Sequence, residues 1–173
     1  MNGQEKVVVF IDGQNMLFGA RDTGVELVYN KIKTFFDRQF NVIGRRFYSA
    51  YEEGNAGQMR FFKVILDLGY ELKIKPLRVY IDMVEQRREE KKIDVWLTTD
   101  LIKLAHEDRY DRALVFSGDT DFIPAYEYLL TFNKKIGIWT WNKRCSRELV
   151  NFSKDNENID LRLFDDISNF ISN

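Results

Sequence analysis

Two groups of aspartates lie where buried strands are expected to end. In FIDGQNMLF, residues 10–18, Asp12 ends an apolar run and Asn15 follows three residues later. In ALVFSGDTDFIPAYEYL, residues 113–129, Asp119 and Asp121 follow a second apolar run with one residue between them. Oxygen ligands of this kind suit hard divalent cations, but an aspartate before a helix is also a common N-terminal cap. The pattern leaves both interpretations open, and Asp121, next to the expected helix, is the expected cap.

A second pair of aspartates, Asp94 and Asp100, lies in a stretch with helical periodicity, Ile93–Glu107. Asp100 lies beside the apolar stripe of that helix, where a carboxylate is costly without a partner or a metal ion. Asp94 lies about 120° around the helix and about 9 Å along it, so both join one site only if Asp94 is at or before the first turn. The alternatives are an N-cap for Asp94 and a salt bridge between Asp100 and Lys103.

Clustered carboxylates repel one another, so at least one is expected to have a raised pKa unless a cation neutralises the group. Mg²⁺ prefers oxygen ligands and commonly combines a few carboxylates with substrate phosphate. Such an ion can activate a water molecule and stabilise charge on a phosphoryl group. Zinc is disfavoured because the chain has one histidine and one cysteine, too few for the usual nitrogen and sulfur ligands.

The elements that would position these aspartates alternate between strand and helix patterns. Strands are expected at residues 6–12, 42–51, 70–76, 112–117 and 135–141, with helices at 25–40, 57–69, 93–107 and 123–132 and a short helix from Ser146. The charged run 85–92 and the polar run 153–158 are expected to be solvated loops. This alternation predicts an α/β fold with a mostly parallel sheet, whose ligands bind beyond the carboxyl ends of the strands.

Composition narrows the classes of function. The chain has 173 residues and a formal net charge of -1, so nucleic-acid binding requires a local basic patch rather than bulk attraction. The single cysteine, Cys145, excludes an internal disulfide framework and fits a reducing compartment. The longest early apolar run, Val7–Ile11, is too short for a signal or membrane segment, so a cytoplasmic protein without membrane attachment is expected.

Three motifs in order, VVVFIDGQN, KKIDVWLTTDLIKLA and ALVFSGDTDFIPAYEYL, together resemble the NYN domain of the LabA-like group, within the PIN-like nuclease superfamily. The resemblance covers most of residues 6–141. It implies a three-layer α/β/α sandwich and a metal-dependent ribonuclease with Mg²⁺ or Mn²⁺ in an acidic pocket. Ile93 stands where the family often has glycine. We expect one domain over residues 1–173, with a motif-bearing core at about 6–141 and a strand and helix extension at 144–173.

The resemblance also implies roles for individual residues. Asp12, Asp100 and Asp119 would be the inner metal ligands, and Asp94 and Asp121 would hold metal-bound waters or a second ion. Asn15 would position the scissile phosphate, with Ser117 and Thr120 in support. The expected partner is single-stranded RNA, with phosphate contacts from basic residues before the Asp94 helix and after the strand at 135–141: Arg87, Arg88, Lys92, Lys143 and Arg144. Trp141 or Tyr51 would stack an unpaired base.

Other functions remain open at this stage. A related module could bind RNA or a protein with little turnover, and the segment Phe164–Ile171 or an exposed helix face could mediate homodimerisation. A phosphatase of the haloacid dehalogenase type also has Asp-X-Asp after a strand, but Ile123 stands where that pattern has threonine. A metal-dependent sugar transferase would leave FIDGQN unexplained.

Overall fold

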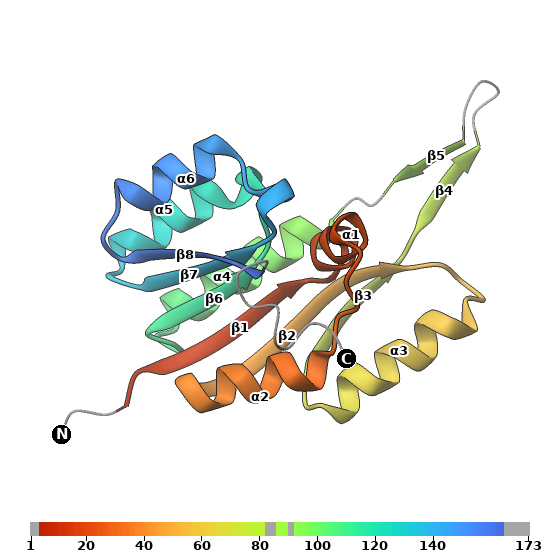
Figure 1. Cartoon of the computed structure of the whole chain (residues 1–173), viewed down its shortest axis with the longest axis horizontal. Helices are drawn as coiled ribbons and strands as arrows, with labels where there is room; N and C mark the ends of the chain where they lie inside the picture. Colours follow the sequence, from red (N-terminus) through yellow and green to blue (C-terminus); the bar gives the residue numbers. More distant parts are fainter. Residues whose placement is uncertain (1–3, 82–85, 90–91, 165–173) are drawn as a thin grey trace.

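A six-stranded parallel sheet forms the centre of the molecule (Figure 1). The computed structural model describes residues 4–81, 86–89 and 92–164. The strands lie in the order β3-β2-β1-β6-β7-β8, and every adjacent pair is parallel. Their bounds are β1 Lys6–Asp12, β2 Asn41–Tyr51, β3 Glu71–Pro76, β6 Arg112–Phe116, β7 Lys135–Thr140 and β8 Ile159–Leu163. The predicted α/β fold with a parallel central sheet is confirmed.

The strands form because short β-branched and aromatic runs are buried on both faces of the sheet. In β1, Val7, Val9 and Ile11 face one apolar core, whereas Val8 and Phe10 face the other. Three helices cover the first face: α1 Gly13–Thr23, α2 Tyr29–Gln39 and α3 Ala56–Asp67. Three cover the second: α4 Ile93–His106, α5 Ile123–Thr131 and α6 Arg147–Lys154. The result is the predicted three-layer sandwich.

The strand order reverses between β1 and β6. From β1 the chain builds β2 and β3 on one side, then crosses back to continue with β6, β7 and β8 on the other. The helices that follow β1 and β6 therefore leave toward opposite faces of the sheet. In open parallel sheets, ligands bind outside the carboxyl ends of the strands at this type of reversal. Asp12 ends β1, and Asp119 follows β6 by three residues.

Two elements differ from the sequence-based expectations. The charged run expected to be a solvated loop instead contains strand β5, Gln86–Glu89, which pairs antiparallel with β4, Arg78–Ile81. These two strands form a separate ribbon that extends away from the main sheet (Figure 1). Helix α1 was not expected, because its mean hydropathy is low and only one side of it meets the core. None of the described helices is long and apolar enough to cross a bilayer.

Helix α1 approaches the sheet closely at Gly19. A Cβ atom there would lie 1.8 Å from the Trp141 ring, so only glycine allows the two to pack. Trp141 is 1% exposed and also packs against Phe164. The prediction that Trp141 stacks a base is therefore wrong, since no face of its ring is free. Phe164 is itself buried, and the rest of the predicted dimerisation segment, residues 165–171, lies outside the described residues.

Candidate functional site

Asp12 sits at the carboxyl end of β1 and is almost fully buried, with 6% of its surface exposed. One carboxylate oxygen, Oδ1, accepts a hydrogen bond of 3.0 Å from the Asn15 amide, which makes Asp12 the N-cap of α1. The other, Oδ2, accepts one of 3.0 Å from the Ser117 hydroxyl. Each oxygen keeps a second lone pair. Capping and ligand roles are therefore compatible at Asp12.

The loop after β6 is tied to the end of β1 by a chain of hydrogen bonds. The Asn15 side-chain oxygen accepts from the Gly118 amide at 3.2 Å, and Ser117 Oγ accepts from the Asp119 amide at 3.2 Å. Asp119 Oδ1 accepts from the Asp121 amide at 2.9 Å and so caps the short helix η1, Thr120–Phe122. The expectation that Asp121 is the cap is therefore wrong; Asp121 is exposed, and Asp119 has the capping role.

Gly118 allows the loop after β7 to pack closely against the loop after β6. A Cβ atom at Gly118 would lie 2.3 Å from both the Arg144 carbonyl oxygen and Thr140 Oγ1. Arg144 belongs to η2, Asn142–Arg144, the short helix after β7. The loops after β1, β6 and β7 therefore meet at one rim of the sheet, as the parallel arrangement predicts.

Asp94 reaches the same rim from the other face of the sheet. It is the second residue of α4, whose N-cap is Lys92, so the alternative that Asp94 is the N-cap is wrong. The positive end of the helix dipole favours a carboxylate in this first turn. Asp94 is exposed on the surface. The condition for Asp94 to join the site, a position in the first turn, is met.

The electrostatics show that these aspartates act on one another. Burial raises the pKa of Asp12 from 3.8 to about 6. The charges of Asp94 and Asp119 add to this increase, whereas the hydrogen bonds from Asn15 and Ser117 oppose it. Partial removal from solvent and the charges of Asp119 and Asp121 raise the pKa of the Asp94 carboxyl. The predicted raised pKa in a repelling carboxylate cluster is thus present. We call Asp12, Asp94, Asp119 and Asp121 the acidic cluster.

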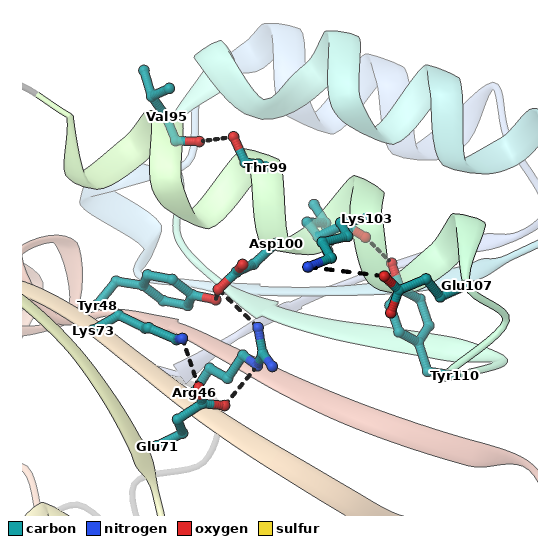
Figure 2. Close-up of polar contacts among 11 residues, drawn as sticks. Arg46, Tyr48, Glu71, Lys73, Val95, Thr99, Asp100, Lys103, Glu107 and Tyr110 are labelled. Carbon is teal, nitrogen blue, oxygen red and sulfur yellow. Dashed lines mark hydrogen bonds and ion pairs between the residues drawn. The ribbon is translucent and has the colours of Figure 1, made fainter.

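Asp100 makes its polar contacts with β2, and the proposal below therefore leaves it out of the inner metal ligands. Its Oδ2 accepts a hydrogen bond of 2.8 Å from the Tyr48 hydroxyl and forms an ion pair of 2.8 Å with Arg46 (Figure 2). Both partners come from β2, so Asp100 fastens α4 to the sheet. The alternative salt bridge to Lys103 is wrong, because Lys103 pairs with Glu107. A carboxylate neutralised by a guanidinium has little remaining attraction for a cation.

The predicted RNA-binding residues have different surroundings. Lys92 is exposed at the start of α4, close in sequence to Asp94. Lys143 donates to the Asp22 carbonyl at 2.8 Å, and Arg144 pairs with the Asp22 carboxylate at 2.7 Å, so both contact the end of α1. Arg87 and Arg88 belong to β5, and their side chains lie outside the described part of the chain.

The donor atoms of the acidic cluster fit a hard divalent cation, since all are carboxylate oxygens next to the Asn15 amide. A second observation comes from Tyr126, which is fully buried and whose hydroxyl has no hydrogen-bond partner among the described residues. Burial raises the pKa of Tyr126, and the charges of Asp12 and Asp119 raise it further. In the described ranges, however, no three His, Cys, Asp or Glu side chains are close enough to hold a metal ion together. Exposed Asp94 and Asp121 would have to turn inward.

Sequence reasoning missed two features near this rim. Tyr126 lies within the third motif, and α5 brings it near enough to Asp12 and Asp119 for their charges to act on it. Lys73 and Lys75 lie on β3 beside Trp96 of α4. The alternation in Lys73-Ile74-Lys75 was a usable signal, because it puts both lysines on one face of a strand.

Comparison with known proteins identifies the family. The family model of the NYN domain matches residues 6–160. The chain belongs to the NYN domain family. Its NYN domain is 25% identical, over 150 residues, to the Low amplitude and bright protein LabA of Synechococcus elongatus, an alignment that covers 84% of this chain and 79% of that protein.

A solved structure has the same fold as this NYN domain. The crystal structure of a protein of unknown function from Vibrio parahaemolyticus superimposes with a TM-score of 0.76 and 22% sequence identity. The superposition covers 93% of this chain and 94% of that one. The resemblance to the LabA-like NYN group is therefore confirmed, and with it the PIN-like fold.

Proposed function

We propose that this protein is a metal-dependent ribonuclease that hydrolyses phosphodiester bonds of single-stranded RNA at the acidic cluster. The observation that carries the proposal is that Asp12 and the loop of Asp119 are joined through Ser117 at the reversal point of a parallel sheet, with Asp94 near enough for the charge of Asp119 to act on it. Helix capping accounts for Asp12 and Asp119, whereas neither Asp94 nor Asp121 is an N-cap. Membership in the NYN family, a PIN-like nuclease fold, supports the same reading.

The residues of the chain have separate tasks in this proposal. Asp12, Asp94 and Asp119 would hold Mg²⁺ or Mn²⁺, with Asp121 binding a metal-coordinated water. The bound ion would supply a water of lowered pKa and stabilise charge on the phosphate. Ser117 and the Asn15 amide fix the orientation of the Asp12 carboxylate. Tyr126 has a hydroxyl free to donate into the cluster.

The role proposed for Asn15 differs from the one predicted from the sequence. Its side-chain oxygen already accepts from the Gly118 amide, so the side chain joins the loops after β1 and β6. The amide nitrogen of the same side chain remains able to donate to a phosphate oxygen. Asn15 therefore both supports the loop and faces the substrate in this proposal.

The test is degradation of a labelled single-stranded RNA by the full chain with Mg²⁺, with Mn²⁺ and with a chelator. We expect metal-dependent cleavage with 5′-phosphate ends, abolished in Asp119→Asn and retained in the matched variant Asp67→Asn, an exposed carboxylate on α3. A wild-type protein that binds the RNA but leaves it intact with both metals would contradict the proposal.

A non-catalytic RNA- or protein-binding module is the second candidate. One observation favours it: within the described residues the carboxylates do not already converge on a single metal position. The same degradation assay separates the two candidates, because the module would retain RNA or partner binding without any metal-dependent product.

A further inference from the structure

Two partly exposed lysines of β3 lie against Trp96 of α4. The Lys73 ammonium lies 5.4 Å from the centre of the Trp96 ring, and that of Lys75 lies 4.7 Å from it. Leu72 and Ile74 pack against the core on the α1–α3 face, so the two lysines point to the α4 face. We call Lys73, Lys75 and Trp96 the lysine platform.

The charges around this platform do not balance. Glu71 pairs with Lys73 at 2.6 Å and with Arg46 at 3.1 Å, and Arg46 pairs in turn with Asp100 (Figure 2). This network already matches two cations with two anions before Lys75 is added. Lys75 makes no ion pair that the described residues record, and its ammonium is held close to that of Lys73 over one aromatic ring. Glu71 already neutralises Lys73, so the Lys75 charge is the one left to attract an additional anion to this ring.

The platform lies at the same rim as the acidic cluster. Across the sheet, Asp12 aligns with Tyr48 and Tyr48 aligns with Lys73, so Lys75 lies two residues nearer the carboxyl ends of the strands. In the first turn of α4, Asp94 and Trp96 are two residues apart and therefore point to different flanks of the helix. Asp94 interacts with Asp119 beyond β6, and Trp96 contacts the lysines of β3. The start of α4 separates a negative flank from a positive one.

We propose that the lysine platform binds a backbone phosphate of single-stranded RNA, a short distance along the strand from the phosphate at the acidic cluster. This inference rests on the proposed function. A chain with net charge -1 and a cluster of carboxylates at its active rim repels RNA unless fixed positive charge lies beside it. The platform supplies that charge without relying on flexible side chains, because Trp96 restrains both lysines. RNA is favoured over an acidic peptide because the adjacent acidic cluster requires a metal-bridged phosphate.

The test measures the salt dependence of RNA binding by the full chain. Fluorescence anisotropy with a labelled single-stranded RNA in chelator prevents cleavage. Each phosphate contact on a single strand contributes about 0.7 to the slope of log affinity against log salt concentration. We expect Lys73→Gln with Lys75→Gln to flatten that slope by about 0.7, as loss of one phosphate contact requires, and to weaken binding most at low salt. The double variant Lys63→Gln with Lys154→Gln, two exposed lysines on α3 and α6, has the same net charge and should bind as the wild type does.

The outcomes separate this inference from the proposed function. If the wild-type protein cleaves RNA and the platform variant matches the control variant in salt slope and affinity, the inference about the lysine platform is overturned and the proposed function stands. A wild-type protein that neither binds nor cleaves RNA overturns both. Polyglutamate is added as a competitor at the same charge concentration as unlabelled RNA. If it competes as strongly as the RNA does, the platform binds acidic peptides and the inference is overturned as well.

Discussion

At the residue scale, the central feature is the buried carboxylate of Asp12, whose contribution to the free energy of unfolding depends on pH. The pKa of Asp12 is raised from 3.8 to about 6, chiefly by burial, so the folded protein binds a proton more tightly than the unfolded chain does. The acid form therefore favours folding below pH 4. This contribution is lost as the pH rises through the window up to 6, and the deprotonated protein is left destabilised by about 3 kcal/mol.

Substitution of Asp12 by asparagine should remove this pH dependence. In chelator, we expect the free energy of unfolding of the wild type to fall, relative to that of Asp12→Asn, by about 3 kcal/mol between pH 4 and pH 7. Urea unfolding at a series of pH values measures this difference. Parallel stability curves for the two proteins would show that Asp12 is not strained by burial and by its neighbours.

The unpaired hydroxyl of Tyr126 gives a second prediction at this scale. In the metal-free protein, Tyr126→Phe should raise the free energy of unfolding by about 1 kcal/mol, because a buried polar atom without a partner is removed. The same variant should cleave RNA more slowly than the wild type if the hydroxyl donates to the loaded site. Thermal unfolding and single-turnover cleavage measure the two effects, and a marked loss of stability would mean that the hydroxyl has a partner.

At the element scale, we expect Asp100 to position α4 through its contacts with β2 rather than to hold a metal ion. Removal of one partner of a buried ion pair commonly costs about 3–5 kcal/mol. We expect Asp100→Asn to lie near the lower end of that range, since the Tyr48 hydroxyl can still bond to the amide oxygen. Chemical denaturation tests this, with the exposed variant Asp67→Asn as the control. A change below about 0.5 kcal/mol would contradict the fastening role.

The loop contact at Gly118 belongs to the same scale. Gly118→Ala forces a methyl group against the Arg144 carbonyl, and we expect a loss of about 1–3 kcal/mol of stability together with slower cleavage, because Asp119 moves with the loop. Gly44→Ala in β2 is the matched control, since its Cβ would lie 3.5 Å from Val8 in ordinary contact. Equal stability of the two variants would show that the loop adapts freely.

At the scale of the whole molecule, the alternation of strands and helices was sufficient to predict the sheet and the rim. Apolar runs such as residues 6–12 are buried on both faces, and a buried run leaves a clear signal in sequence. The partner of Asp100 was not predictable, because the contact joins residues 52 positions apart and depends on the direction in which α4 crosses β2. Helix α1 could not be predicted because its polar side leaves a narrow buried stripe of small residues and one methionine: Gly13, Met16, Gly19 and Ala20.

The site shows the same division between what sequence predicts and what it leaves open. Asp12 and Asp119 were placed together because both end parallel strands, a property of the sheet as a whole. Whether Asp94 or Asp100 belongs to the candidate site depends on how α4 is rotated about its axis. The apolar periodicity of α4 determines that rotation only approximately. Lys75 and Trp96 come together because β3 is the edge strand beneath α4, a contact that no local pattern specifies.

The most direct test of the account is the rate of Mn²⁺-dependent RNA cleavage by Asp94→Asn and Asp100→Asn at a temperature where both are folded. The acidic cluster includes Asp94 and excludes Asp100. We therefore predict a loss of at least about 100-fold for Asp94→Asn, and for folded Asp100→Asn a rate close to that of the wild type with an unchanged Mn²⁺ requirement. The reverse order, with Asp100→Asn inactive and Asp94→Asn active, would contradict the account.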